Sequence, residues 1–322
     1  MGMDYKKANL AFFFMIVSTF IIMVYISFFQ ALTGRNLSLP MNNALCELMI
    51  LLPAVAVTWY SGEKFTSVVP FRKISVWTGM LSALYVITLF PLVMFVNAFS
   101  QLFVDNVVAS ISDQVVELPM AMMVISIGIF GPFVEEVVFR GVIFHSFRRS
   151  GRIIASMVLS AVLFGMMHLN FNQFAYATVM GIMFCLMVEA TGSVIPSFIA
   201  HAVFNSIEVI AMYASMDEVQ NLSGNDDSKV MLIAMLAVLL VASILFTVAA
   251  LFIVYLMARI EGRQSYMISL LPQKKNEDTG SIDMTTMENG GKKQSLFTVP
   301  LVIAMAISVC FMIYSAIVMR SM

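Results

Sequence analysis

Long apolar runs alternate with short polar breaks along the whole chain of 322 residues. A helix needs roughly 20 apolar residues to cross the hydrocarbon core of a bilayer. Two breaks, 169–172 and 190–193, are short enough for tight helical hairpins. The pattern predicts an all-α, polytopic transmembrane helical bundle, with about eight core spans plus one C-terminal span. The nine runs lie at about 9–30, 43–60, 76–98, 121–147, 153–169, 172–190, 194–214, 230–258 and 297–319.

Composition supports lipid as the solvent of these runs. Hydrophobic residues make up 60% of the chain and charged residues 11%, whereas soluble domains average about 45–50% apolar and 25% charged residues. A net charge of −1 argues against a nucleic-acid partner. The first run is too long for the apolar part of a cleaved secretory signal, so we expect it to be a transmembrane helix.

The basic residues predict an orientation. If the N-terminus is cytoplasmic and all nine runs span, only Arg35, Lys229 and Arg320 fall in segments on the other side. Such a bias is the positive-inside rule. We therefore expect an integral, multi-pass protein of the plasma membrane with a cytoplasmic N-terminus and with membrane lipid as a partner.

The chain divides into three parts by polarity. Residues 1–258 form the predicted body of the protein, in which 120–210 holds the motifs described below. Residues 259–296 are polar and poor in aromatic side chains, which predicts a disordered cytoplasmic loop. Residues 297–322 would then add an accessory transmembrane helix.

Several ionisable residues lie inside these runs, where each costs a few kcal/mol or more and usually has a partner or a function. The fourth run holds Glu135, Glu136 and Arg140. Glu136 and Arg140 are four residues apart, so they share one face of a helix and can pair. Glu135 points about 100° away from Glu136, which leaves it free to face another element.

Two histidines and an amide lie at comparable depth on other runs. His168 lies near the end of the fifth run, and His201, Asn205 and Glu208 form one polar stripe on the seventh. At 1.5 Å per residue, Glu135 and His168 both lie roughly 21–22 Å from the cytoplasmic ends of their runs. We therefore expect these side chains to converge.

Such a set has two chemical interpretations. Glu135 and His168 could activate one water, because a carboxylate and an imidazole are both general bases. His201 and Asn205 could then donate hydrogen bonds to an oxyanion, which completes a set for amide hydrolysis. Alternatively, Glu135, His168 and His201 would form a two-histidine, one-carboxylate metal site with an open position.

Three short motifs occur in order on the fourth, fifth and seventh runs. They are EExxxR (Glu135 to Arg140), FxxxH (Phe164 to His168) and HxxxN (His201 to Asn205). Together they resemble the CPBP intramembrane proteases, the CAAX prenyl protease and bacteriocin-processing group that is also called the Abi family. The resemblance covers about residues 120–210.

The resemblance implies a role for each matching residue. Asn205 is a good oxyanion donor and a poor zinc ligand, so we expect the metal-free version, with no cofactor, although zinc stays open. In this version Glu135 and His168 activate water, His201 and Asn205 stabilise the oxyanion, and Glu136 and Arg140 orient the site.

The function predicted from all this is an intramembrane endopeptidase that cleaves a membrane-associated protein or peptide, with its cavity open to the cytoplasmic side. Candidate substrates are a prenylated tail and a bacteriocin or pheromone precursor. Two alternatives stay open. One is a non-catalytic bacteriocin-immunity or scaffold protein of the same family, and the other is a proton-coupled transporter.

Overall fold

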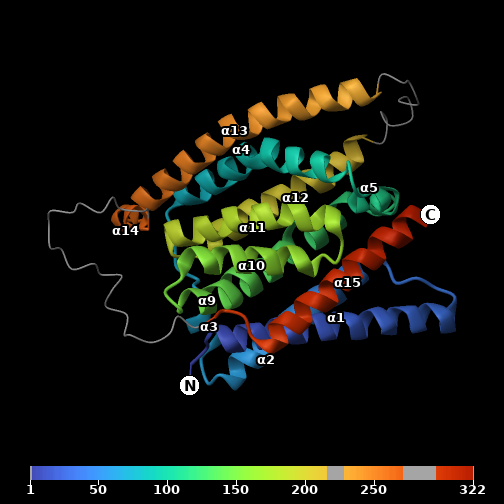
Figure 1. The fold of residues 1–322 in the computed structure, drawn as a ribbon, viewed down its shortest axis with the longest axis horizontal. Helices are drawn as coiled ribbons and strands as arrows, with labels where there is room; N and C mark the ends of the chain where they lie inside the picture. The colour runs from blue at the N-terminus through green and yellow to red at the C-terminus, as the bar shows by residue number, and fades with distance from the viewer. Residues whose placement is uncertain (1, 216–227, 271–294, 322) are drawn as a thin grey trace.

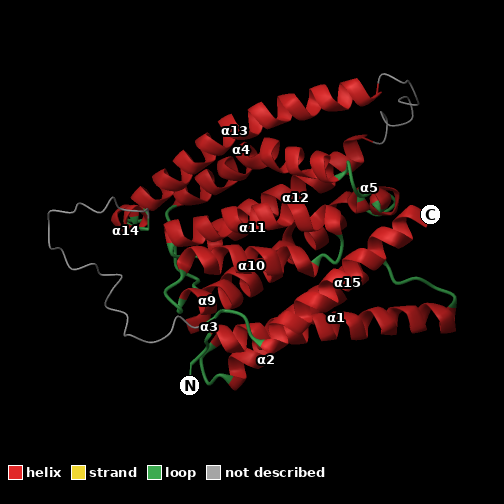
Figure 2. Cartoon of the chain, viewed as in Figure 1, coloured by secondary structure: helices red, strands yellow, loops and turns green. Residues whose placement is uncertain are grey.

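The computed structural model describes residues 2–215, 228–270 and 295–321, and within them every regular element is a helix. Figures 1 and 2 show an elongated bundle of long helices. Eight helices in the described part are long and apolar enough to cross a membrane, which confirms the all-α polytopic fold. They are α1 (Tyr5–Thr33), α2 (Leu39–Tyr60), α4 (Val76–Ser100), the composite helix Met120–Arg148, α11 (Phe171–Thr191), α12 (Ile195–Ser215), α13 (Ser228–Ile260) and α15 (Val299–Ser321).

The fifth apolar run is shorter than a span, which corrects the count of nine. It forms α10 (Ile153–Met167), whose 15 residues extend about 22 Å. His168 caps this helix, Leu169 takes a left-handed backbone with φ of 54°, and Asn170 caps the start of α11. The chain therefore turns back part-way across the bundle, and α11 runs in the direction opposite to α10.

The helix Met120–Arg148 is not a regular α-helix. It consists of α7 (Met120–Met123), η1 (Val124–Phe130), α8 (Gly131–Glu135), η2 (Glu136–Phe144) and α9 (His145–Arg148), of which η1 and η2 are π-helical. Segments of π-helix are rare and often occur at functional sites. Both glutamates of the EExxxR motif lie at the junction of α8 and η2.

The long helices pack in layers (Figure 1). Helix α13 runs along α4 on one side, α11 and α12 occupy the centre, and α1, α2 and α15 lie on the other side of α10. Small residues allow a close approach between α10 and α11. A Cβ on Gly181 would lie 2.8 Å from the Cβ of Ala161, a type of contact common between transmembrane helices.

The two ends of the bundle differ. The N-terminus, α3 (Phe65–Val68), α9 and α14 (Gln264–Ser269) lie at one end, which we call the N-terminal end. Helix α5 (Val107–Ser110) lies at the opposite end with the C-terminus (Figure 1). Helix α6 (Ser112–Val116) lies there too, because the Tyr213 hydroxyl near the end of α12 donates a hydrogen bond of 2.8 Å to the Val115 carbonyl.

Part of the predicted polar loop packs against the bundle. Arg263 donates a hydrogen bond of 3.0 Å to the Glu189 carbonyl, and the Tyr266 hydroxyl donates one of 2.6 Å to the Glu189 carboxylate. That carboxylate also pairs with Arg148 at 2.8 Å. The prediction of a disordered loop is therefore wrong for this first part, whereas 271–294 lies outside the described residues.

Helix α15 packs along α1 as an added layer. The buried Asn9 side chain of α1 donates hydrogen bonds to the Leu296 carbonyl at 2.8 Å and to the Thr298 hydroxyl at 3.1 Å. These bonds fix the chain just before α15 begins. The C-terminal helix is thus held to the body by polar contacts as well as by packing.

Candidate active site

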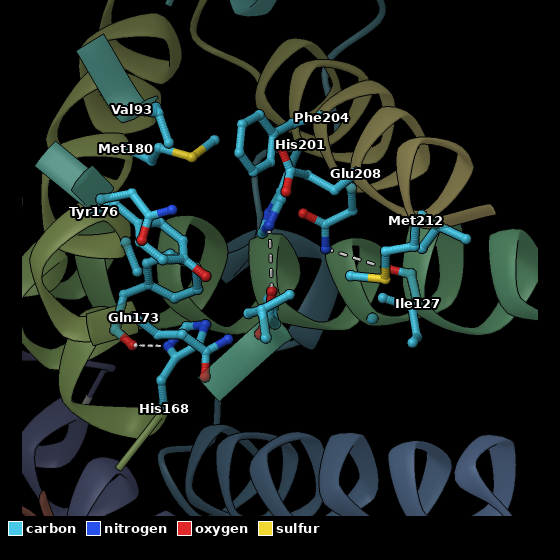
Figure 3. A pocket seen from close by; sticks show the side chains of 18 of the residues that line it. Val93, Ile127, His168, Gln173, Tyr176, Met180, His201, Phe204, Glu208 and Met212 are labelled. Carbon is cyan, nitrogen blue, oxygen red and sulfur yellow. Dashed lines mark hydrogen bonds and ion pairs between the residues drawn. The ribbon is translucent and has the colours of Figure 1, made fainter. Parts of the chain in front are cut away.

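One cavity brings the predicted site residues together (Figure 3). Its volume is about 300 Å³, and its walls come from α2, α4, the region of α5, the composite helix, α10, α11 and α12. Glu135, His168, His201 and Asn205 all line it. The cavity lies in the half of the bundle away from the N-terminus, so a cytoplasmic N-terminus and a cytoplasmic opening, predicted together, do not agree with this structure.

A buried ion pair lies next to the residues that line the cavity. Arg140 Nη1 lies 2.9 Å from Glu136 Oε1, and both side chains are almost completely buried. The guanidinium of Arg140 also lies over the ring of Phe164 at 4.2 Å and near the ring of Phe184 at 5.2 Å. Cation–π contacts of this kind are strongest where water is excluded.

His201 bridges the two glutamates of the motif. Its Nδ1 lies 2.9 Å from Glu136 Oε1, and its Nε2 lies 3.5 Å from Glu135 Oε2. Because Glu136 is held beside Arg140 as a carboxylate, it accepts, and Nδ1 carries the proton of that bond. The other nitrogen, Nε2, is then directed at Glu135 and the cavity.

Glu135 and Glu136 have opposite environments although they are neighbours in sequence. Glu136 is fully buried, whereas the Glu135 side chain keeps 18% of its surface exposed and lines the cavity. The angle between consecutive helical side chains explains this division. Glu136 therefore faces the interior of the bundle, and Glu135 is the carboxylate that a ligand can reach.

His168 presents one nitrogen to the cavity. Its Nδ1 lies 3.1 Å from the Phe164 carbonyl, and because a carbonyl can only accept, Nδ1 carries the proton. Its Nε2 is therefore left with a lone pair. The turn that follows fixes the residue, since the Asn170 side chain donates a hydrogen bond of 2.8 Å to the His168 carbonyl. Leu169, with its unusual positive φ, separates the two.

Asn205 lies one turn beyond His201 on α12, facing η1. Its Nδ2 donates a hydrogen bond of 3.2 Å to the Ile127 carbonyl, and an amide nitrogen has a second hydrogen to donate. The two helices approach closely here, because a Cβ on Gly128 would lie 3.2 Å from the Ser206 Cα. The amide is thus held at the cavity wall with one donor to spare.

Comparisons with known proteins find relatives of the segment that holds the three motifs. The family of Type II CAAX prenyl endopeptidase Rce1-like proteins matches residues 117–207, the segment that holds all three motifs. YdiL of Bacillus subtilis (strain 168), a candidate membrane peptidase, is 29% identical over 89 residues, which cover 28% of this chain and 36% of YdiL. No solved structure matches.

The resemblance to the CPBP family is confirmed. The match to YdiL covers little more than a third of that relative, and α1, α13 and α15 lie outside the segment that the family matches. In the matched segment and the helices around it, the structure brings the three motifs into one cavity.

Glu47 and Glu208 add carboxylates beyond the three CPBP motifs. Glu47, on α2, is buried beside the cavity and near enough to Glu135 for their charges to interact. Gly131 leaves room for it, because a Cβ there would lie 3.2 Å from Glu47 Oε1. Glu47 lies inside the second apolar run, and none of the three motifs includes it. Glu208, the end of the polar stripe on α12, also lines the cavity.

The zinc alternative requires Glu135, His168 and His201 to meet at one ion. Within the described residues, no group of three His, Cys, Asp or Glu side chains is arranged to hold a metal. His201 is also engaged at both ring nitrogens, by Glu136 and towards Glu135. The set does not fit a metal in this arrangement, and we derive no step through one.

Proposed function

We propose that the chain is an integral-membrane endopeptidase that cleaves a peptide bond in a membrane-associated protein or peptide. The observation that supports it most is the shared cavity of Glu135, His168, His201 and Asn205. The family match, to proteins described as endopeptidases, supports the same reaction class. We further propose that the N-terminus is cytoplasmic and that the protein resides in the plasma membrane.

The reaction would begin with a water held between Glu135 and His168. The unprotonated Nε2 of His168 positions the water, and Glu135 takes its proton as the general base. The hydroxide attacks the carbonyl carbon of the scissile bond, and the carbonyl oxygen becomes an oxyanion. As the C–N bond breaks, Glu135 returns the proton to the leaving amine, so one water is consumed for each bond cleaved.

His201 and Asn205 would stabilise the oxyanion. Asn205 has one amide hydrogen left after its bond to the Ile127 carbonyl. His201 can donate from Nε2 only when its ring is doubly protonated, because Nδ1 already donates to Glu136. The ring lies between the two carboxylates, with Glu136 facing Nδ1 and Glu135 facing Nε2.

The test is a comparison of the membrane and secreted peptidomes of cells that produce equal amounts of wild type and Glu135→Gln. We expect one or a few precursors to persist uncut only with Glu135→Gln. Glu117→Gln is the matched control, because Glu117 is exposed and does not line the cavity. Identical peptidomes, together with a phenotype on deletion, would overturn the proposal in favour of an immunity or scaffold protein.

A further inference from the structure

We propose that the substrate enters the cavity from the end of the bundle opposite the N-terminus, which is the non-cytoplasmic face. Its chemical class is a membrane-anchored polypeptide with basic residues beside the scissile bond. The inference rests on the proposed endopeptidase function, and it assigns that function a side of the membrane and a class of substrate.

The cavity extends along the helices that line it towards the end of the bundle farther from the N-terminus. On α4 it contacts Val93, Met94 and Asn97, near the end farther from the N-terminus, and on α12 it runs from His201 to Met212, towards that same end. On α2, which begins at that same end, it contacts Asn43 and Glu47. Val108 of α5 completes the wall. The catalytic groups therefore lie at the inner end of a cavity that extends towards α5.

The wall of the cavity is polar on this side. Asn97, Asn106 and Gln173 line it, and the neighbouring Asn172 donates a hydrogen bond of 2.7 Å from its side chain to Asn97 Oδ1. Because α10 ends after about 22 Å, its turn into α11 does not fill the outer part of the bundle. Polar side chains at membrane depth typically line water-filled cavities, so this side can admit water and a peptide.

The N-terminal end of the bundle is closed. Val69 packs so tightly on η2 that a Cβ on Gly141 would lie 2.7 Å from its Cγ1. The backbone of the same segment is tied to the start of α12, where the Val194 amide donates a hydrogen bond of 3.1 Å to the Pro70 carbonyl. Farther out, the Glu189 carboxylate, fully buried, ties α11 to α9 and to the segment before α14. No peptide passes through this packing without unfolding it.

Charge distinguishes the two ends. Basic side chains, among them Lys64, Arg148 and Arg149, gather at the closed end, which the positive-inside rule assigns to the cytoplasm. The open end carries acidic groups. They are the exposed residues Asp105, Asp113 and Glu117 and, inside the cavity, Glu208; among the side chains described there, Arg35 is the one basic group.

This distribution defines the class of substrate. A cleft of one charge sign with low-dielectric walls concentrates ligands of the opposite sign, so the open end favours a peptide with Lys or Arg next to the cleaved bond. A cytoplasmic tail, prenylated or not, would meet the closed and basic end. The geometry thus points to a precursor whose cleavage site is exposed on the non-cytoplasmic face.

Cysteine accessibility tests the side of entry independently of catalysis. We would place one cysteine at Asn106, in the cavity wall, or at Lys64, at the closed end, and add a membrane-impermeant maleimide to intact cells. We expect Asn106→Cys to react in intact cells and Lys64→Cys only after permeabilisation; the reverse pattern would overturn the inference. The background is the full chain with its native cysteines replaced by alanine: Cys46, Cys185 and Cys310.

A second readout connects the entrance with cleavage. Attaching a bulky maleimide to Asn106→Cys in intact cells is expected to abolish cleavage of the precursor found by the peptidome comparison. The same label on Gln114→Cys, which is exposed near that end outside the cavity wall, is expected to leave cleavage intact. Cleavage that survives the Asn106 label would show that the substrate enters elsewhere. If the wild type cleaves nothing, the proposed function fails, while the labelling pattern still reports which end is outside.

The charge preference has its own test. For a peptide with lysine beside the cleaved bond, Glu208→Gln is expected to raise KM about fivefold, the effect of losing one partly exposed ion pair. The KM for a twin peptide with glutamine at those positions is expected to stay unchanged. An equal rise for both peptides would refute the preference for basic substrates.

Discussion

Removing the buried ion pair of Glu136 and Arg140 is expected to affect the stability of the protein and the rate of cleavage differently. We consider Glu136→Met, Arg140→Met and the double substitution, because methionine fills a similar volume without a charge. Each single change leaves a buried charge without its main partner, which typically costs about 3–5 kcal/mol. Glu136→Met is expected to cost more, since Arg140 then keeps only the faces of Phe164 and Phe184. After Arg140→Met, Glu136 keeps the hydrogen bond from His201 at 2.9 Å.

The double substitution removes both charges and is expected to recover most of the lost stability, as apolar replacements of buried pairs often do. Activity is expected to behave differently. His201 loses the acceptor for Nδ1 in the double variant, and loss of the group that fixes a catalytic histidine lowers kcat by up to about 10⁴-fold.

The assay combines unfolding free energies of the four proteins in detergent with rates of cleavage of one precursor. The reasoning predicts a double variant that is nearly as stable as wild type and inactive. It is refuted if the losses of the single variants add in the double variant, or if the stable double variant cleaves at the wild-type rate. The first result would mean that the two charges do not interact, and the second that Glu136 does not orient His201.

Three further predictions follow from the same site. Asn205→Ala is expected to lower kcat by about 10²–10³-fold with little change in KM, because it removes one oxyanion donor; a rise in KM alone would assign Asn205 to substrate binding. Glu47→Gln keeps the shape of the side chain and removes a titratable carboxyl group near Glu135, so the pH–rate profile is expected to shift, whereas an unchanged profile would make Glu47 purely structural. Prolonged dialysis against a chelator is expected to leave cleavage intact, and loss of activity that zinc restores would establish the metal alternative.

The sequence predicts the core of the site better than its surroundings. Glu136 and Arg140 pair as their four-residue spacing indicates, and Glu135 turns away from them as the helical angle requires. The hydrogen bond between His201 and Glu136 could not be predicted from spacing, because the two residues lie 65 positions apart in the chain and on different helices. Their contact depends on how α12 packs against the composite helix.

The errors of sequence reasoning also have physical causes. The run ending at His168 is almost long enough for a span, but the left-handed Leu169 and the capping Asn170 stop the helix early. The segment around Arg263 looks like a solvated loop by composition. It is ordered by Glu189, a carboxylate on α11 whose partners are distant in sequence.

The central claim is that Glu135 drives hydrolysis of a peptide bond in this cavity. The most direct measurement incubates the purified, bilayer-reconstituted protein with the precursor identified in cells and weighs the products by mass spectrometry. Wild type is expected to give two fragments whose masses sum to the precursor plus one water, whereas Glu135→Gln is expected to leave the precursor intact. Equal cleavage by both proteins, or none by the folded wild type, would contradict it.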